Sequence, residues 1–142
     1  MKIAVEKINE IEVKLEENAA ASLWDMDSFD VKFVDQIHLD CGFLRAGGEI
    51  IVNVIAATHR LITCSRCLEE TVQDVSHAFT LSYEANHLGD YLEIDKEIRE
   101  ELLLNFPMKV LCKTDCKGIC PRCGVNLNNQ RCKCQVKPKL TE

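Results

Sequence analysis

The spacing of apolar and polar residues over the first 83 positions is typical of β-strands. Apolar residues alternate with charged or polar ones over 11–16, 29–33, 37–43 and 75–83, the period of a strand with one buried face. The β-branched run that begins at Ile50 is apolar on both faces and continues to Thr63, as expected for a central strand. Gly47-Gly48 supplies the backbone freedom that a tight hairpin needs before it. A mainly antiparallel sheet is therefore predicted.

The period changes near residue 94. One apolar residue then recurs at every fourth position, in the order Ile94, Ile98, Leu102 and Phe106. This stripe predicts one late helix, with Asp95 as its N-cap and Pro107 as its end, because proline has no N–H for the helix ladder. A short helical turn is also predicted over 19–24. The expected fold class is α+β, a mainly antiparallel β body with one late helix and a small C-terminal zinc-binding segment.

The amino-acid composition excludes several classes of protein. The chain has 142 residues, 46% hydrophobic and 28% charged, which is ordinary globular composition and excludes wholesale disorder. No apolar run approaches the roughly 20 residues that span a bilayer, and no apolar signal-peptide core precedes Glu6. We therefore expect a cytoplasmic protein with no membrane partner. Nine cysteines in a reducing compartment then indicate metal binding or redox chemistry rather than structural disulfides.

The net charge of −6 hides two opposite regions. Residues 108–142, called the tail below, hold eight Lys/Arg against two acidic residues and six of the nine cysteines, a net charge of +6. Residues 1–107, the body, hold nine basic and 21 acidic residues, a net charge of −12. We therefore predict an acidic β-rich body (1–107) ending in a helix and a basic, cysteine-rich, zinc-binding tail (108–142). Nucleic acid is not excluded, because the tail alone is basic.

The sharpest motif of the tail is Cys120-Pro121-Arg122-Cys123-Gly124. Two thiolates at this spacing bind one tetrahedral metal ion, and the glycine lets backbone N–H groups turn towards the sulfur atoms. Cys132 follows a polar loop as the predicted third ligand, and Cys116 and Cys134 compete for the fourth place. Soft thiolate ligands favour structural Zn²⁺ over the two alternatives, an iron–sulfur cluster and unligated thiols.

A second pair, Cys64-Ser65-Arg66-Cys67, follows the long strand. A thioredoxin-like redox pair precedes a helix, whereas the residues after Cys67 alternate like a strand, so that interpretation is not favoured. The pair either completes a metal site with two tail cysteines or serves packing and turn geometry. Cys41 is predicted to be a buried small hydrophobe, and His59 to be a strand-face residue rather than a ligand. No catalytic motif appears, so we predict no catalytic residues.

Three motifs, taken in order, resemble the YceD family, which is named for accumulation of the large ribosomal subunit RNA. They are Cys64-Ser65-Arg66-Cys67-Leu68, then Ile94 to Ile98 running into Leu102 to Met108, then the cysteine segment from Cys112 to Cys134. The resemblance covers roughly residues 37–134. It implies a role in the maturation or stability of that RNA.

We therefore expect a non-enzymatic factor in ribosome assembly. Its zinc-ordered tail would contact RNA phosphates while the acidic body contacts a basic ribosomal protein. The candidate RNA contacts are Lys117, Arg122, Arg131 and Lys133. One alternative is an acidic module that escorts a basic ribosomal protein without touching RNA. Another, less favoured, is a thiol oxidoreductase using Cys64 and Cys67. No small-molecule substrate is expected.

Overall fold

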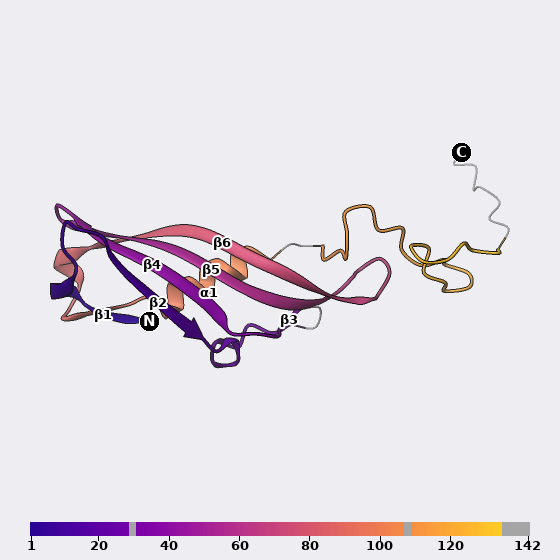
Figure 1. The fold of residues 1–142 in the computed structure, drawn as a ribbon, viewed down its shortest axis with the longest axis horizontal. Helices are drawn as coiled ribbons and strands as arrows, with labels where there is room; N and C mark the ends of the chain where they lie inside the picture. Colours follow the sequence, from indigo (N-terminus) through magenta and orange to yellow (C-terminus); the bar gives the residue numbers. More distant parts are fainter. Residues whose placement is uncertain (29–30, 107–108, 135–142) are drawn as a thin grey trace.

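The longest elements are two paired strands, β5 (Glu49–Thr63) and β6 (Glu70–Glu84). In this computed structural model, which describes residues 1–28, 31–106 and 109–134, they form one antiparallel hairpin from Glu49↔Glu84 to Thr63↔Glu70. The other edge of β5 pairs with β4 (Ile37–Ala46) and, further along, with β3 (Val31–Phe33). β2 (Val13–Ala19) continues the sheet beyond β4. The hairpin runs most of the length of the molecule (Figure 1).

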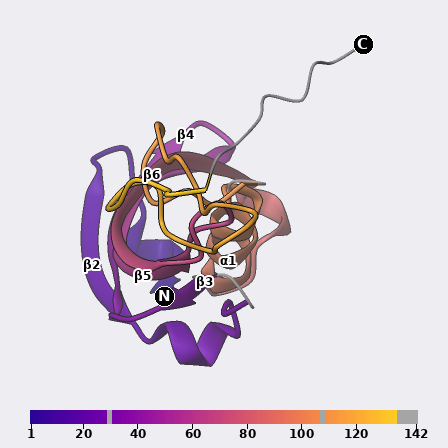
Figure 2. The same cartoon turned by 90° about the vertical axis from the view of Figure 1, so that its right-hand side faces the viewer.

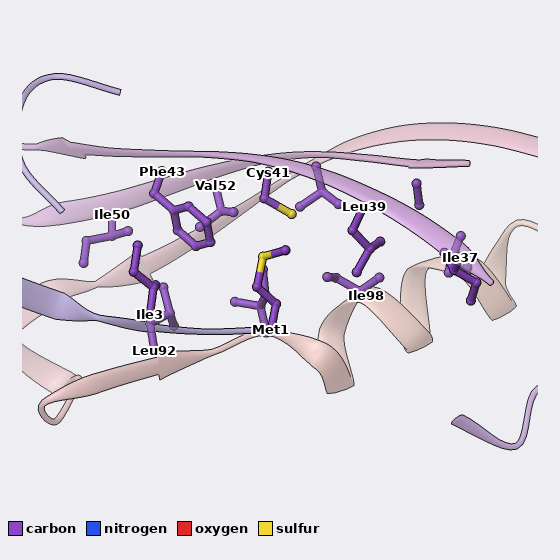
Figure 3. Packing of buried hydrophobic residues seen from close by; sticks show 14 of the residues in the cluster. Met1, Ile3, Ile37, Leu39, Cys41, Phe43, Ile50, Val52, Leu92 and Ile98 are labelled. Atoms are coloured by element: carbon purple, nitrogen blue, oxygen red, sulfur yellow. The ribbon is translucent and has the colours of Figure 1, made fainter. Parts of the chain in front are cut away.

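Shorter elements cover one face of this sheet. β1 (Lys2–Ala4) and β7 (Tyr91–Glu93) form a separate two-stranded antiparallel ribbon, and α1 (Asp95–Leu104) follows directly. Short 3-10 turns occupy Val5–Lys7, Ala21–Trp24 and Ala85–His87. In Figure 3 the ribbon and α1 lie across the core from β4 and β5. The core between these layers is apolar, and its labelled members include Ile3, Leu39, Phe43, Val52, Leu92 and Ile98.

Alternation along β5 decides which face is covered. Ile50, Val52 and Val54 point into the core and are almost fully buried, as alternate positions of a strand require. The intervening residues face away from α1, and Ile55 among them is 48% exposed. β5 is thus central because it pairs along both edges, but it is not buried on both faces as its apolar run suggested. The outer face of the sheet has no covering layer among the described residues.

The expected α+β class is confirmed, with differences in detail. β6 begins at Glu70, five residues earlier than its alternation indicated, and the ribbon strands β1 and β7 were not predicted. The prediction of Asp95 as N-cap is wrong: Ile94 occupies that position without a side-chain cap, and Asp95 is the first helical residue. The helix ends at Leu104, and the predicted stop at Pro107 lies outside the described residues.

The apolar stripe on α1 gives the first testable prediction. Ile98 is fully buried against the sheet, whereas Leu104 on the same helix is 80% exposed. Ile98→Ala should lower the free energy of unfolding by about 2–4 kcal/mol, since it removes buried methyl groups and leaves a cavity. Leu104→Ala, the control, should change it by less than about 0.5 kcal/mol. Urea denaturation followed by circular dichroism measures both, and equal effects of the two variants would contradict the packing described.

Candidate metal centres

The loop that joins β5 to β6 is a tight turn built around two cysteines. The Cys64 N–H donates to the Glu69 carbonyl, and the Leu68 N–H donates back to the Cys64 carbonyl, both at 2.9 Å. Leu68 closes the turn with a φ of +62°, a left-handed conformation that costs a residue with a side chain roughly 1–2 kcal/mol. The turn holds Cys64 and Cys67 side by side at the tip of the hairpin.

Tail residues lie against this tip. The Ser65 N–H donates to the Val110 carbonyl at 2.8 Å, and the Gln73 amide donates to the Leu111 carbonyl at 3.0 Å. The Arg66 guanidinium donates to the Cys116 carbonyl at 3.0 Å. Figure 1 shows the tail continuing beyond the hairpin loop, and the end-on view of Figure 2 shows it in front of the sheet. These bonds bring two tail cysteines to the two cysteines of the turn.

The first four-cysteine group, called the hairpin cluster, combines body and tail. Its members are Cys64, Cys67, Cys112 and Cys116, whose four Sγ atoms all lie within 4.8 Å of one another. The Sγ atoms of Cys64 and Cys116 are 3.7 Å apart, as are those of Cys67 and Cys112. Three of the four side chains are buried.

The second group, called the tail cluster, repeats the same turn. Its members are Cys120, Cys123, Cys132 and Cys134, again with every Sγ atom within 4.8 Å of the others. The Cys120 N–H donates to the Val125 carbonyl, and the Gly124 N–H donates to the Cys120 carbonyl, both at 2.9 Å. Gly124 has a φ of +71°, so it occupies the place that Leu68 takes in the hairpin turn.

The sulfur geometry fits a tetrahedral metal ion. Four thiolates around a zinc ion, with bonds of about 2.3 Å, lie about 3.8 Å from one another. The Cys123–Cys132 and Cys120–Cys132 distances are 3.6 and 3.2 Å, and those of the hairpin cluster are 3.7 Å. A disulfide would require about 2.05 Å. Each cluster could therefore hold one metal ion with four sulfur ligands.

Backbone N–H groups favour the thiolate form of the first cysteine in each turn. Burial raises the pKa of Cys64, but hydrogen bonds from the backbone of Cys67, Cys112 and Arg66 outweigh it and bring the pKa down to about 6. In the tail cluster, the equivalent donors are the backbone N–H groups at positions 123 and 122, which lower the pKa of Cys120 to about 6.

One other cysteine of each cluster shows the opposite effect. Burial and the neighbouring thiols raise the pKa of Cys112 to about 12, and hydrogen bonding to Cys132 is the main cause that raises the pKa of Cys134 to about 12. Four thiols so close together cannot all ionise unless a cation balances them. A divalent metal ion supplies that charge, so the donor set fits such an ion.

The structure thus divides the predicted ligands between two sites. Cys120, Cys123 and Cys132 lie together, and Cys134 is the fourth member of their cluster. Cys116 lies instead with Cys64, Cys67 and Cys112. Cys112 had not been assigned to either site from the sequence. The spacing of the cysteines along the chain does not show this division. It follows from the hairpin turn, which holds Cys64 and Cys67 beside Cys112 and Cys116. Cys41 lies in the main core, as predicted, and burial raises its pKa to about 11.

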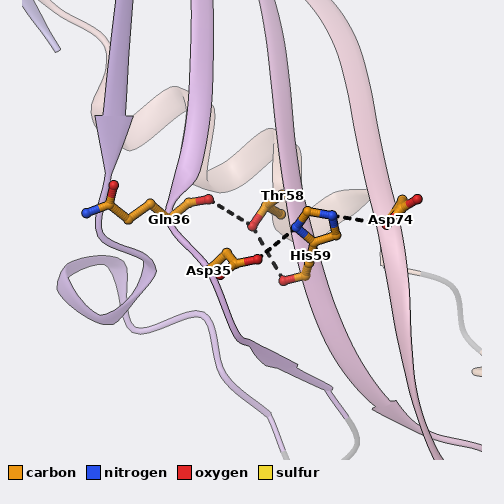
Figure 4. Close-up of polar contacts among 5 residues, drawn as sticks. All are labelled: Asp35, Gln36, Thr58, His59 and Asp74. Carbon is orange, nitrogen blue, oxygen red and sulfur yellow. Dashed lines mark hydrogen bonds and ion pairs between the residues drawn. The ribbon is translucent and has the colours of Figure 1, made fainter.

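His59 is a member of neither cluster and lies between two carboxylates (Figure 4). Its Nδ1 is 2.8 Å from an Asp35 carboxylate oxygen, and its Nε2 is 3.1 Å from one of Asp74. Next to it, the Thr58 hydroxyl donates to the Gln36 carbonyl at 3.2 Å. Both ring nitrogens therefore contact carboxylates from neighbouring segments, and His59 ties strands together rather than binding with the cysteines.

The fold and the site define a class: an antiparallel sheet with a late helix and two four-cysteine candidate metal centres at one end. The family model described as large ribosomal RNA subunit accumulation protein YceD matches residues 88–141. The resemblance to the YceD family is thereby confirmed over the C-terminal part of the chain, and the first of its three motifs, Cys64 to Leu68, lies outside the matched residues.

Two curated relatives match a 48-residue stretch. The Arabidopsis thaliana protein named large ribosomal RNA subunit accumulation protein YCED homolog 1, chloroplastic, is 40% identical over it, and the Zea mays protein of the same name is 38% identical. The stretch covers 34% of this chain and 15–16% of those relatives. No solved structure matches the chain significantly. Within the described residues, no helix has the length and apolarity needed to cross a membrane.

The left-handed residue after each cysteine pair gives the second prediction. Gly124 has open space around its Cα, so Gly124→Ala adds strain from φ alone. We expect about fivefold weaker Co²⁺ binding at the tail cluster, equivalent to about 1 kcal/mol, measured from the thiolate-to-cobalt absorption. Gly48→Ala is the matched control, because Gly48 also has open space but no positive φ. Unchanged Co²⁺ affinity in Gly124→Ala would contradict the turn geometry.

Proposed function

We propose that this protein is a non-enzymatic factor that supports accumulation of large-subunit ribosomal RNA during ribosome assembly. Its two cysteine clusters would be structural zinc sites. The observation that carries the proposal is the hairpin cluster, because its cysteines join a basic segment to the tip of an acidic body. The names of the matched relatives support the link to ribosomal RNA. The cytoplasmic location stays a prediction.

The donor set supports a structural role for the metal. Zinc accepts four thiolates in a closed tetrahedron, whereas a catalytic zinc keeps one position open and usually has histidine or carboxylate ligands. Each cluster supplies four cysteines and, among the described residues, no histidine or carboxylate. The metal would therefore fold the tail rather than activate a substrate, and its binding energy would be folding energy.

The cations around the clusters are available for phosphate. Lys117, Arg131 and Lys133 are exposed and take part in no salt bridge among the described residues, and Arg122 is exposed beside them. A zinc ion with four thiolates carries a net charge of −2, so part of this positive charge balances the centres. The remainder can neutralise RNA phosphates, and metal binding would hold it in a fixed arrangement.

Metal content gives the third prediction. The purified protein should contain two Zn²⁺ per chain, measured by atomic emission against protein concentration. Cys116→Ser and Cys134→Ser should each lower the content to about one, because they remove ligands from different clusters. Cys41→Ala, a control in the core, should leave it at two. Loss of both ions from Cys116→Ser together with full retention in Cys134→Ser would contradict two separate sites.

Salt dependence of RNA binding gives the fourth prediction. The charge reversals Lys117→Glu, Arg131→Glu and Lys133→Glu, combined, should weaken binding to large-subunit ribosomal RNA. The negative slope of log affinity against log salt should become shallower by about 2, because each phosphate that a cation neutralises contributes roughly 0.7–0.9 to its magnitude. Filter binding between 50 and 200 mM salt measures it, and zinc content should be unchanged.

The matched control reverses three exposed lysines of the body, Lys7, Lys14 and Lys32. It changes the net charge by the same amount but should leave the slope as it is. Equal weakening in both triple variants would show a general charge effect and contradict RNA contact by the tail.

One surface favours the second candidate, an acidic module that binds a basic ribosomal protein without RNA contact. Strand register places Glu16, Asp40 and Asp74 on the uncovered outer face of the sheet, the same face as Ile55. Binding of purified basic large-subunit proteins should weaken in the triple variant Glu16→Gln, Asp40→Asn, Asp74→Asn. It should not weaken in the control triple variant, in which Glu6, Glu10 and Glu93 become Gln.

The redox alternative is not favoured, since Cys64 and Cys67 lie between two strands, with no helix directly after them.

A further inference from the structure

One hydrogen bond joins the two cysteine clusters. The Asn128 side-chain NH₂ donates to the Cys116 sulfur at 3.3 Å. Asn128 belongs to the loop between Cys123 and Cys132 of the tail cluster, whereas Cys116 belongs to the hairpin cluster. Among the described residues, the other N–H donors to cluster sulfurs are backbone groups near the same cluster.

The Asn128 side chain is held from both ends. Its amide oxygen accepts the Lys117 N–H at 2.9 Å, and its NH₂ also donates to the Asn126 side-chain oxygen at 2.9 Å. The Asn128 backbone N–H donates to the same Asn126 oxygen at 2.9 Å. These contacts fix the direction of the NH₂ group, so its bond to sulfur depends on the loop being in place.

The loop is also anchored beside the hairpin turn. The Leu127 N–H donates to the Gly118 carbonyl at 2.9 Å, and the Asn129 amide donates to the Glu69 carboxylate at 3.3 Å. Gly118 lies so close to the turn that an added Cβ would be 3.3 Å from the Arg66 carbonyl oxygen. The loop of the tail cluster is therefore packed onto the segment that carries the hairpin cluster.

We propose that the two clusters bind metal as one coupled unit, in which Asn128 of the tail-cluster loop orients and stabilises the Cys116 thiolate of the hairpin cluster. The proposal rests on the metal sites of the proposed function. Donors to ligating atoms typically change metal affinity ten- to a hundredfold. Metal at the tail cluster orders its loop, so it raises the affinity of the hairpin cluster, and the coupling is reciprocal.

Chain connectivity predicts the order in which the two clusters bind metal. The tail cluster closes within residues 120–134, whereas the hairpin cluster joins positions 64–67 to 112–116, and β6, β7 and α1 lie between them in the chain. Closing the shorter loop costs less chain entropy. The tail cluster should therefore load first and present Asn128 to Cys116.

The test measures each cysteine separately in the full-length chain. The protein is loaded with Zn²⁺, exposed to increasing concentrations of a chelator and alkylated with iodoacetamide, and the alkylated cysteines are identified by peptide mass spectrometry. In Asn128→Ala, the four cysteines of the hairpin cluster should lose protection at chelator concentrations at least about tenfold lower than in the unmodified protein. Gln130→Ala, the control in the same loop, removes an exposed side chain with no hydrogen bond to a cluster sulfur and should show no such shift.

Two further variants separate coupling from local damage. Asn128→Asp keeps the shape and the acceptor for the Lys117 N–H but lacks the NH₂ donor, so it should show the same loss. Cys134→Ser disables the tail cluster and should expose the hairpin cluster to a similar degree. Protection of the hairpin cluster equal to the unmodified protein, in either Asn128→Asp or Cys134→Ser, would overturn the coupling.

The failure of the metal sites themselves looks different. If all eight cysteines of the two clusters react equally with and without Zn²⁺ in the unmodified protein, then the proposed zinc sites are wrong and the coupling falls with them. If the unmodified protein is protected and Asn128→Ala matches Gln130→Ala, then the zinc sites stand and the coupling alone is overturned.

Discussion

Repulsion among clustered thiolates is the constraint on which the basic end of this molecule depends. Each group of four sulfur atoms lies within 4.8 Å, with pairs as close as 3.2–3.7 Å. Burial and the neighbouring thiols push Cys112 and Cys134 away from ionisation, whereas backbone N–H groups draw Cys64 and Cys120 towards it. Backbone N–H donors stabilise part of that charge, and a divalent cation can balance the rest. Few apolar side chains lie between 109 and 134, so the proposed metal binding would supply the folding energy that a core supplies elsewhere.

The sequence predicted the kind of ligand at the basic end of the molecule better than it predicted which cysteines lie together. The turn at Cys120-x-x-Cys123-Gly124 could be predicted from these residues alone, and the structure contains that turn. Which half-sites meet could not be predicted, because spacing along a chain does not show that a hairpin brings Cys64 and Cys67 beside the tail. The Cys-x-x-Cys spacing of both pairs could have indicated that the two turns are alike. Leu68 obscured this likeness, because it occupies the left-handed position that Gly124 occupies in the other turn.

The body was predictable where alternation was long and uncertain where elements were short. The run from Ile50 fixed the central strand, but two three-residue strands, β1 and β7, carry too few positions for a period to appear. The cap at Asp95 was misplaced by one residue, since acidic residues suit both the cap and the first turn of a helix. The apolar run of β5 indicated two buried faces, yet only tertiary packing decides that α1 and the ribbon cover one of them.

The long hairpin also makes the net charge of −12 on the body compatible with the proposed contact to RNA. Fifteen residues of β5 at about 3.3 Å each separate the far end of the sheet from its tip by roughly 50 Å. At physiological salt the Debye length is about 8 Å, so acidic residues at the far end contribute little to the field at the tip. In the proposed RNA contact, Lys117 and Lys133 would act through their local surroundings, which the two cysteine clusters would hold in place. The outer face remains free to meet a basic partner at the same time, because it lies on the sheet and not on the tip.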